Sequence, residues 1–150
     1  MIKFKIVFML FSIILISSCA TTYKRASSPE SVGYYDSLLQ QNMYEVTFNG
    51  NSDVSTTTAQ DYALLRAAEI CIENGYKTFD IINSKDNSKT ETGAYTNHYG
   101  RFQSATYISS STYPKIALII KCSKENNLTF IAEQIKENLR KKYKLEDKNK

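Results

Sequence analysis

The alternation of apolar and polar positions predicts a strand near the start of the folded region. In MYEVTFNG, residues 43–50, every second side chain is apolar. The apolar positions are Tyr44, Val46 and Phe48. This period of two is typical of a strand with one buried face. The turn-forming run at 49–52, Asn-Gly-Asn-Ser, is expected to end the strand.

Residues 55–76 predict the clearest helix of the chain. Its polar residues recur three and four positions apart and form one narrow stripe. The stripe consists of Tyr62, Arg66, Glu69 and Glu73. Most other positions are apolar, so we expect this helix to be covered on more than one side. Thr57 with Gln60 has the pattern of a capping box, and Gly75 suits the end of the helix.

Three further elements follow from the same patterns. YKTFDII, residues 76–82, predicts a strand directly after the helix. YPKIALIIKC, residues 113–122, is apolar on both faces, so we expect both faces to be largely buried and the strand to be central. The last periodic segment, residues 127–145, predicts an amphipathic closing helix. Its apolar positions are Leu128, Ile131, Ile135, Leu139 and Tyr143.

The segment 84–112 is too long for an ordinary connection between strands. It is rich in serine and threonine, so it is either mobile or an elaborated hairpin, with RFQSATYIS at 101–109 as a candidate extra strand. We therefore predict an α+β fold in the order β-α-β-(β)-β-α: a single small sheet of three to four strands with two helices packed against it. The domain is expected to span 32–145, and a disordered tail to follow over 146–150.

The N-terminus has the pattern of a secretory signal. Two early lysines precede an apolar run over 6–16, which is too short for a comfortable transmembrane helix. The next residues, ISSC at 16–19, resemble the lipobox of bacterial lipoproteins. This resemblance implies removal of a signal peptide over 1–18, a diacylglycerol on the sulfur of Cys19, and a further acyl chain such as palmitate on its amine. The alternatives are an ordinary signal peptide with a chance cysteine, or an uncleaved anchor.

The lipoprotein resemblance also implies a location. Ala20, rather than an aspartate, follows the cysteine, which implies the outer membrane of a Gram-negative cell, facing the periplasm. Residues 19–31 are then the lipidated cysteine and a flexible tether. The periplasm is oxidising, and with Cys19 lipidated two cysteines remain. Cys71 and Cys122 are therefore a candidate disulfide, and two inert core thiols are the alternative.

Three stretches between Tyr44 and Phe79 resemble a family of small Gram-negative lipoproteins of unknown function. They are YEVTFNGNS, DYALLRAAE and GYKTF, and their order and spacing also match. The resemblance implies an envelope location and a fold, and it implies no chemistry.

Composition and charge narrow the functional classes. Lysine and arginine total 19 against 15 aspartate and glutamate, and two of the lysines lie in the signal segment, so no nucleic-acid partner is expected. The basic stretch 136–150 suits the end of a helix, with contact to anionic lipid or polymer as the alternative. The single histidine, His98, lies in 84–112, a poor scaffold for a catalytic base. One histidine and two cysteines are too few for zinc. We expect no catalytic residue, metal or cofactor.

Two groups of residues are candidates for specific contacts. The first group, in the 84–112 segment, could contact a partner through rigid aromatic area and one cation. It consists of Tyr95, Tyr99, Arg101 and Tyr107. The second is the polar stripe of the helix, in which Arg66 is expected to pair with Glu69 or Asp61 as a structural ion pair. An anion or carboxylate site at Arg66 is the alternative.

Two functions follow from these expectations. The first is a lipid-anchored, non-enzymatic envelope protein, a binding or structural module held at the membrane by the lipid on Cys19, whose partner is an envelope protein or a cell-wall polymer. The second is an unrecognised hydrolase acting on envelope material.

Overall fold

The computed structural model describes residues 23–99 and 103–145 of the chain. The expectations for Cys19, for the signal peptide over 1–18, for Arg101 and for the tail over 146–150 lie outside these residues. No helix in the described ranges is long and apolar enough to cross a membrane.

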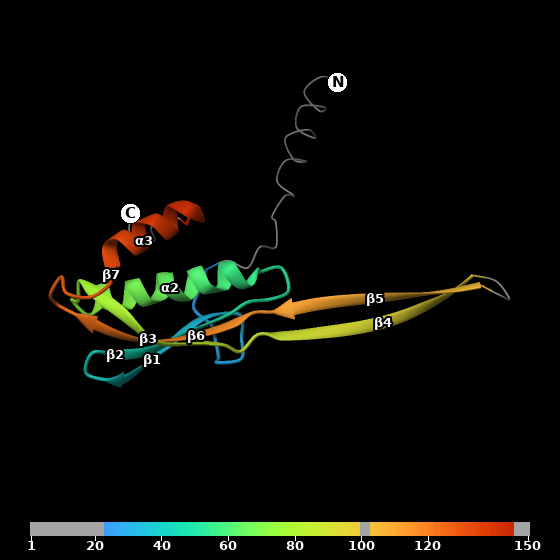
Figure 1. The fold of residues 1–150 in the computed structure, drawn as a ribbon, viewed down its shortest axis with the longest axis horizontal. Coiled ribbons are helices and arrows are strands. Elements are labelled where there is room, and N and C mark those ends of the chain that lie inside the picture. The colour runs from blue at the N-terminus through green and yellow to red at the C-terminus, as the bar shows by residue number, and fades with distance from the viewer. Residues whose placement is uncertain (1–22, 100–102, 146–150) are drawn as a thin grey trace, which may run out of the picture.

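The molecule consists of a body and a projecting arm (Figure 1). The body contains a five-stranded antiparallel sheet, in the spatial order β1 (Gly33–Gln40), β2 (Met43–Asn49), β6 (Lys115–Ser123), β3 (Thr78–Asp86) and β7 (Phe130–Ile131). The arm is a separate two-stranded sheet of β4 (Lys89–Tyr99) and β5 (Gln103–Tyr113). Two helices, α2 (Thr56–Glu73) and α3 (Ala132–Lys142), lie on one side of the main sheet. The α+β class is confirmed, whereas the predicted three to four strands are too few.

The helix α2 lies directly on the sheet and forms the core with it. Buried side chains of β2 and β6 face this helix, namely Tyr44, Val46, Phe48, Ile116, Leu118 and Ile120. Four alanines of α2, Ala59, Ala63, Ala67 and Ala68, are fully buried, and such small side chains let the helix lie close to the layers that cover it. The central place predicted for the strand at 113–122 is confirmed, because β6 lies between β2 and β3.

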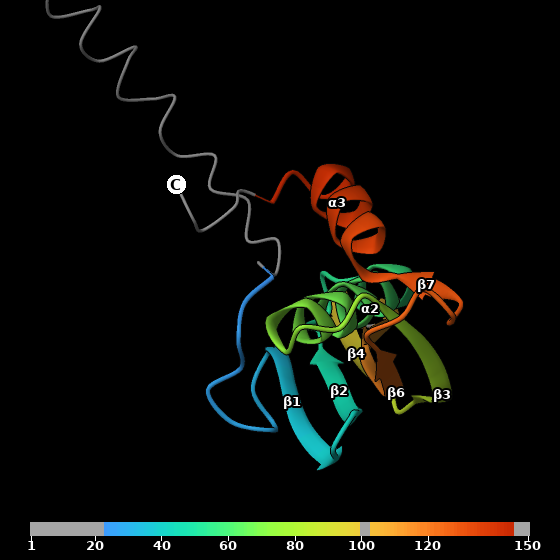
Figure 2. The same cartoon turned by 90° about the vertical axis from the view of Figure 1, so that its left-hand side faces the viewer.

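The helix α3 packs on α2 rather than against the sheet (Figure 2). Leu139 of α3 is buried, and the ring of Tyr143 lies edge-on to Tyr62 of α2 with 4.9 Å between centroids. The body therefore has three layers: sheet, α2 and α3. This arrangement explains why α2 is apolar around most of its circumference. It also corrects the expectation that both helices pack against the sheet.

The closing helix begins later than its apolar periodicity predicts. Leu128 to Ile131 are not helical, and Phe130 and Ile131 form the short strand β7 beside β3. Phe130 stacks on Phe79, and the backbone amide of Thr129 donates a hydrogen bond to Asp80. These tertiary contacts, together with the preference of aromatic and β-branched residues for strands, outweigh the helical pattern here.

The start of α2 also differs from the expected capping box. Ser55 is the N-cap, and its hydroxyl accepts a hydrogen bond from the backbone amide of Thr58 at 3.0 Å. Thr57 and Gln60 already lie inside the first turns of the helix. Three consecutive threonines follow Ser55, so several residues offer a capping hydroxyl and the sequence alone does not select one.

The chain is attached to the body well before residue 32. Tyr23 is buried, and its hydroxyl donates a 2.6 Å hydrogen bond to Glu69 of α2. The backbone of Tyr34 accepts a hydrogen bond from the amide of Ala26 and donates one to the carbonyl oxygen of Lys24, and the Asn49 side chain donates one to the carbonyl oxygen of Pro29. The flexible tether expected as far as Ser31 is therefore held on the body from Tyr23 onward.

The long segment after β3 is the elaborated hairpin, the second of the two sequence alternatives. The chain leaves the body along β3 and β4 and returns along β5 and β6. Within the body the hairpin is flanked by β2 and β7, and beyond the body it continues as the two-stranded ribbon alone (Figure 1). The candidate strand at 101–109 is thus the first part of β5, which begins at Gln103 among the described residues.

Candidate functional site

The ribbon β4–β5 is the part of the described molecule that contributes least to the buried core. Its strands pair antiparallel without a break from Lys89 opposite Tyr113 to Tyr99 opposite Gln103. Each strand has 11 residues, which corresponds to about 35 Å of extended chain. Neither α2 nor α3 covers a face of the ribbon (Figure 1), so both faces are open to contact as far as the described elements go.

One face of the ribbon, the tyrosine face, carries aromatic side chains. Tyr95 and Tyr107 lie directly opposite each other, and their rings stack with 5.3 Å between centroids and 18° between planes. They remain 55% and 44% exposed. Tyr99 is the last residue of β4, opposite Gln103, and its side chain lies outside the described part of the structure. The structure therefore brings two of the predicted contact residues together, while Arg101 lies outside the described residues.

The other face, the threonine face, consists mainly of hydroxyl side chains. Thr90 with Thr112 and Thr96 with Thr106 form two cross-strand hydroxyl pairs, at 3.1 and 3.0 Å. Ile108 projects from the middle of this face and is 75% exposed, the largest value among the exposed large apolar residues. Cross-strand threonine pairs stabilise a ribbon by about 0.2–1 kcal/mol each.

The histidine of the sequence lies on the threonine face too. His98 is opposite Ser104 near the tip of the ribbon, and both residues are exposed. An exposed strand position does not hold a base firmly against a nucleophile, which is what triad chemistry requires. No group of three or more His, Cys, Asp or Glu side chains in the described ranges could hold a metal ion.

The outer edges of the ribbon differ in charge. The strand β5 has no charged residue between Gln103 and Tyr113, whereas β4 carries Lys89 and Glu91. On the β5 side, the neighbouring strand β2 ends at Asn49, opposite Lys115. The backbone of β5 therefore has no strand beside it among the described elements, apart from β4. Such an edge is a template for pairing with another strand.

The polar stripe of α2 forms a buried charge cluster. Arg66 is 5% exposed and donates hydrogen bonds to Asp36 of β1 and to Glu73, both at 2.8 Å, with Glu69 at 3.6 Å. Tyr23 and Arg140 of α3 bind the two oxygens of Glu69. The cluster joins the N-terminal segment, β1, α2 and α3, which fits the structural alternative for Arg66 with Glu69.

Asp61 does not take part in this cluster, contrary to one of the two expected pairings. It accepts hydrogen bonds from the ammonium of Lys142 and the hydroxyl of Tyr143, each at 2.6 Å. Arg66 finds its second and third carboxylates in Glu73 and Asp36 instead. Asp36 lies in β1, a segment without a clear alternation of apolar and polar residues. Its pairing with Arg66 therefore could not be predicted from the sequence.

The surroundings of the cluster shift the proton affinities of its members. Burial, followed by the Glu69 carboxylate, raises the pKa of Tyr23 above the ordinary value for tyrosine. Burial alone would lower the pKa of Arg66, but its bonds to Glu73 and Asp36 outweigh that effect and raise the pKa. Arg66 is therefore a fixed cation whose donors are directed to protein carboxylates.

The two remaining cysteines form a disulfide between the two main layers of the body. Cys71 of α2 and Cys122 of β6 are bonded, with 6.0 Å between their Cα atoms. Both residues are fully buried. The first alternative of the sequence analysis is therefore confirmed for this pair.

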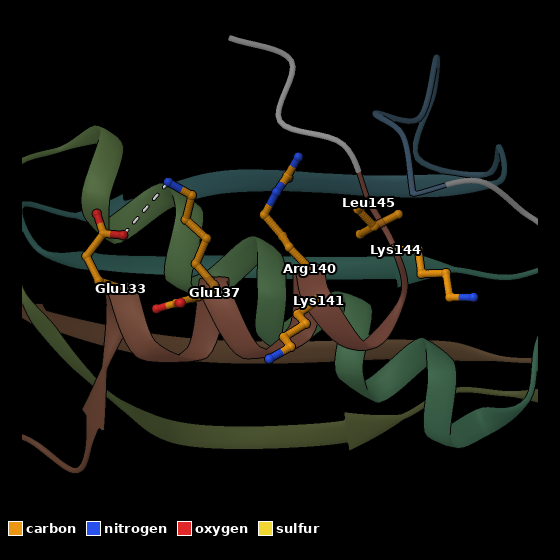
Figure 3. Close-up of a pocket in the computed structure, with 7 residues that line it drawn as sticks. Glu133, Glu137, Arg140, Lys141, Lys144 and Leu145 are labelled. Carbon is orange, nitrogen blue, oxygen red and sulfur yellow. Dashed lines mark ion pairs between the residues drawn. The ribbon is translucent and has the colours of Figure 1, made fainter. Parts of the chain in front are cut away.

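Hollows of the described surface also occur outside the ribbon, two of them on the body. The first follows α3 and is lined by Glu133, Lys136, Glu137, Arg140, Lys141, Lys144 and Leu145 (Figure 3). The second lies near the disulfide and is lined by Gln41, Asn42, Tyr76, Lys121, Cys122, Ser123, Lys124, Asn127 and Leu128. The lining of the first hollow has four basic side chains and two acidic ones; Lys136 pairs with Glu133 at 3.9 Å, and Arg140 pairs with Glu69 of α2 at 3.0 Å. Basic side chains in the last turns of a helix suit the helix dipole, so this lining does not by itself indicate a ligand site.

Comparison with known proteins gives no relative for this chain: no protein-family model, no curated protein and no solved structure matches it. The resemblance to small Gram-negative lipoproteins stays a prediction.

Proposed function

We propose that this protein is a lipid-anchored protein of the bacterial cell envelope whose ribbon binds another envelope protein without catalysing a reaction. The ribbon carries this proposal: it projects from a body that has its own core, and it presents stacked tyrosines and an uncharged strand edge to the outside. Rigid aromatic area and an open strand edge are two common means of protein recognition.

The position in the envelope is supported by the sequence of the N-terminus and by the disulfide. A lipid on Cys19 would hold the body at the outer membrane, facing the periplasm, and a disulfide between Cys71 and Cys122 suits that oxidising compartment. Tyr23 is bound to the body, and three residues of the sequence, 20–22, lie between Cys19 and Tyr23. Four residue-to-residue steps of extended chain span at most about 14 Å, which would keep the body close to the membrane.

The anchor is tested by expression in a Gram-negative host. We expect the full chain to partition into detergent and to carry acyl mass, and Cys19→Ala to do neither. A mature protein that is cleaved before Cys19 but carries no acyl chain would contradict the anchor and leave the role of the ribbon to be tested separately.

The role of the ribbon is tested by removing it. Replacing residues 90–112 with Asn-Gly would join Lys89 and Tyr113 through a two-residue hairpin turn. The shortened chain should stay folded and should no longer bind the partner. A photo-reactive residue at Ile108, which is exposed, should capture an envelope protein in cells. The same residue at Lys124, exposed on the body, is the matched control. Equal capture from both positions, or binding of the ribbon to isolated cell-wall polymer alone, would contradict the proposed protein partner.

A further inference from the structure

The two long edges of the hairpin are protected to very different degrees. Along β3 and β4 the outer edge carries Lys85, Asp86, Lys89 and Glu91. The pairing of β3 also shifts register between Ile81 and Asn83, which makes a bulge. Charges and bulges are the usual means by which proteins prevent unwanted strand pairing. The edge of β5 has neither: its pairing with β4 is regular over 11 residues and it contains no charge, proline or glycine.

We infer that the β5 edge pairs antiparallel with β5 of a second copy of this chain, about a twofold axis that passes beside Tyr107. This inference rests on the proposed function, since it names the partner of the same ribbon. A strand that pairs with itself must be self-complementary, because each residue meets its own surface across the axis. Eleven uncharged residues meet this condition, since no like charges come to lie opposite each other.

The tyrosine face indicates the register of this pairing. With Tyr107 opposite Tyr107 of the second copy, the rings of Tyr95 and Tyr107 continue into the same pair of the other chain, and four tyrosines form one row across a four-stranded sheet. The observed stack has 5.3 Å between its centroids, close to the roughly 4.8 Å that separates neighbouring strands. The spacing already present in one ribbon thus repeats across the interface.

The same register defines every other pair across the interface. Ala105 comes to lie opposite Ser109 of the second copy, on the tyrosine face. On the threonine face, Ile108 comes to lie opposite Thr106 of the second copy, which covers part of its exposed surface. If the lipid holds both copies in one membrane, their high local concentration favours a contact of this modest size.

Cysteine crosslinking of the full chain in a Gram-negative host tests the register. Ala105→Cys and Ser109→Cys, produced together with different tags, should give a mixed disulfide dimer at a yield at least fivefold above that of either variant alone. Ala105→Cys with Ser111→Cys is the matched control, because these two positions lie opposite each other only if the twofold axis passes beside Ile108 instead of Tyr107. A yield for Ala105→Cys with Ser109→Cys no higher than for the control would overturn the inference.

A charge variant gives a second measurement that does not depend on oxidation. Tyr107→Lys sets two ammonium groups opposite each other across the axis, so the detergent-solubilised full chain should sediment as a monomer where the parent sediments as a dimer. Thr92→Lys adds the same charge on β4, away from the axis, and should leave the dimer intact. A parent chain that is monomeric, or a Tyr107→Lys chain that remains dimeric, would overturn the inference.

The experiments separate failure of this inference from failure of the proposed function. Photo-capture from Ile108 that yields only a different envelope protein, without self-crosslinking, would keep the binding role of the ribbon and overturn the second copy as its partner. No capture at all from Ile108 would overturn both. Capture of a second copy would support both.

Discussion

The strands β3 and β6 in the body and β4 and β5 in the ribbon are halves of one long hairpin, yet they are stabilised differently. In β6, alternate residues are buried against α2, and Ile116 and Ile120 are almost completely inaccessible. In β5 the positions on the same face are serine and threonine apart from Ile108, which is mostly exposed. The same backbone ladder thus runs from a core into solvent. Strand formation in the ribbon depends on pairing and on β-branched residues rather than on burial.

This difference separates stability from binding. A two-stranded ribbon alone is marginally stable in water, so the ribbon needs the body to anchor its base. The body gains little in return, because none of the described ribbon side chains belongs to the buried core. Changes in the body should therefore alter global unfolding, and changes in the ribbon should alter local opening and contacts. The predictions below test this division, beginning with the largest effect.

Removal of the disulfide should have the largest effect. The bond closes a loop of 51 residues, for which the chain-entropy model gives about 4 kcal/mol of stabilisation. We expect Cys71→Ala/Cys122→Ala to lose about that much free energy of unfolding in denaturant titrations at neutral pH. Amide exchange near Tyr95 in the ribbon should change only through global unfolding. A loss below about 1 kcal/mol would show that the layers of the body do not depend on the bond.

Removal of the buried cation should have the next largest effect. Arg66→Met leaves Asp36 and Glu73 without their shared partner, and breaking a buried ion pair costs about 3–5 kcal/mol. We expect a loss of about 3 kcal/mol, near the lower limit, because Glu73 is more than half exposed. Lys136→Ala is the matched control: it breaks an exposed pair with Glu133 and should cost less than about 1 kcal/mol.

The elements that sequence patterns predicted well are those in which local and tertiary preferences agree. The strand around Val46, the helix α2 and the central strand β6 all have a periodicity that matches their burial. The expectation that both faces of β6 are covered was only partly met, since Ala117 and Ile119 are half-buried. Both helices lie on the opposite side, so apolar residues on two faces indicated a central strand but not two covering layers.

The less predictable parts depend on long-range contacts. The pairing of Asp36 with Arg66 depends on the position of β1 beside β2, which no local pattern specifies. The strand β7 likewise depends on the contact between Phe130 and Phe79, which are distant in the sequence. The ribbon was one of two alternatives, because the same Ser/Thr-rich composition serves both a mobile segment and a solvated strand pair. Of the candidate contact residues, the register places Tyr95 against Tyr107, which sequence spacing alone did not specify.

A smaller effect is expected from Tyr23, and it depends on pH. Tyr23→Phe removes the hydrogen bond to Glu69, which at neutral pH should cost about 1.5 kcal/mol, as for hydrogen bonds to charged groups. The pKa of Tyr23 is raised in the folded state, so its contribution is complete below pH 10, the ordinary tyrosine value, and is lost as the pH rises above it. The difference between parent and variant should therefore shrink by about 1.4 kcal/mol per pH unit above pH 10.

The control for this pH dependence lies within the same core. Tyr62→Phe keeps the ring that packs between Phe48 and Tyr143, and Tyr62 does not bind Glu69. Burial also raises the pKa of Tyr62, so this variant should show a shift of the same sign without the loss of the Glu69 bond. A Tyr23→Phe difference that grows above pH 10 would contradict the assigned direction.

The smallest effect should come from the ribbon itself. Tyr95→Ala removes the stacked partner of Tyr107, and aromatic pairs of this kind contribute about 0.5–1.5 kcal/mol beyond their buried area. Because the pair lies outside the core, the loss should appear in local opening: amide exchange in β4 and β5 should accelerate about fivefold, while the free energy of global unfolding should change by less than about 0.5 kcal/mol. Thr96→Ala, which breaks the hydroxyl pair with Thr106 on the opposite face, is the matched control and should accelerate the same amides less. If Tyr95→Ala instead lowers the global free energy of unfolding by as much as Tyr23→Phe, the ribbon and the body unfold as one unit, and the division between a stable body and a binding arm fails.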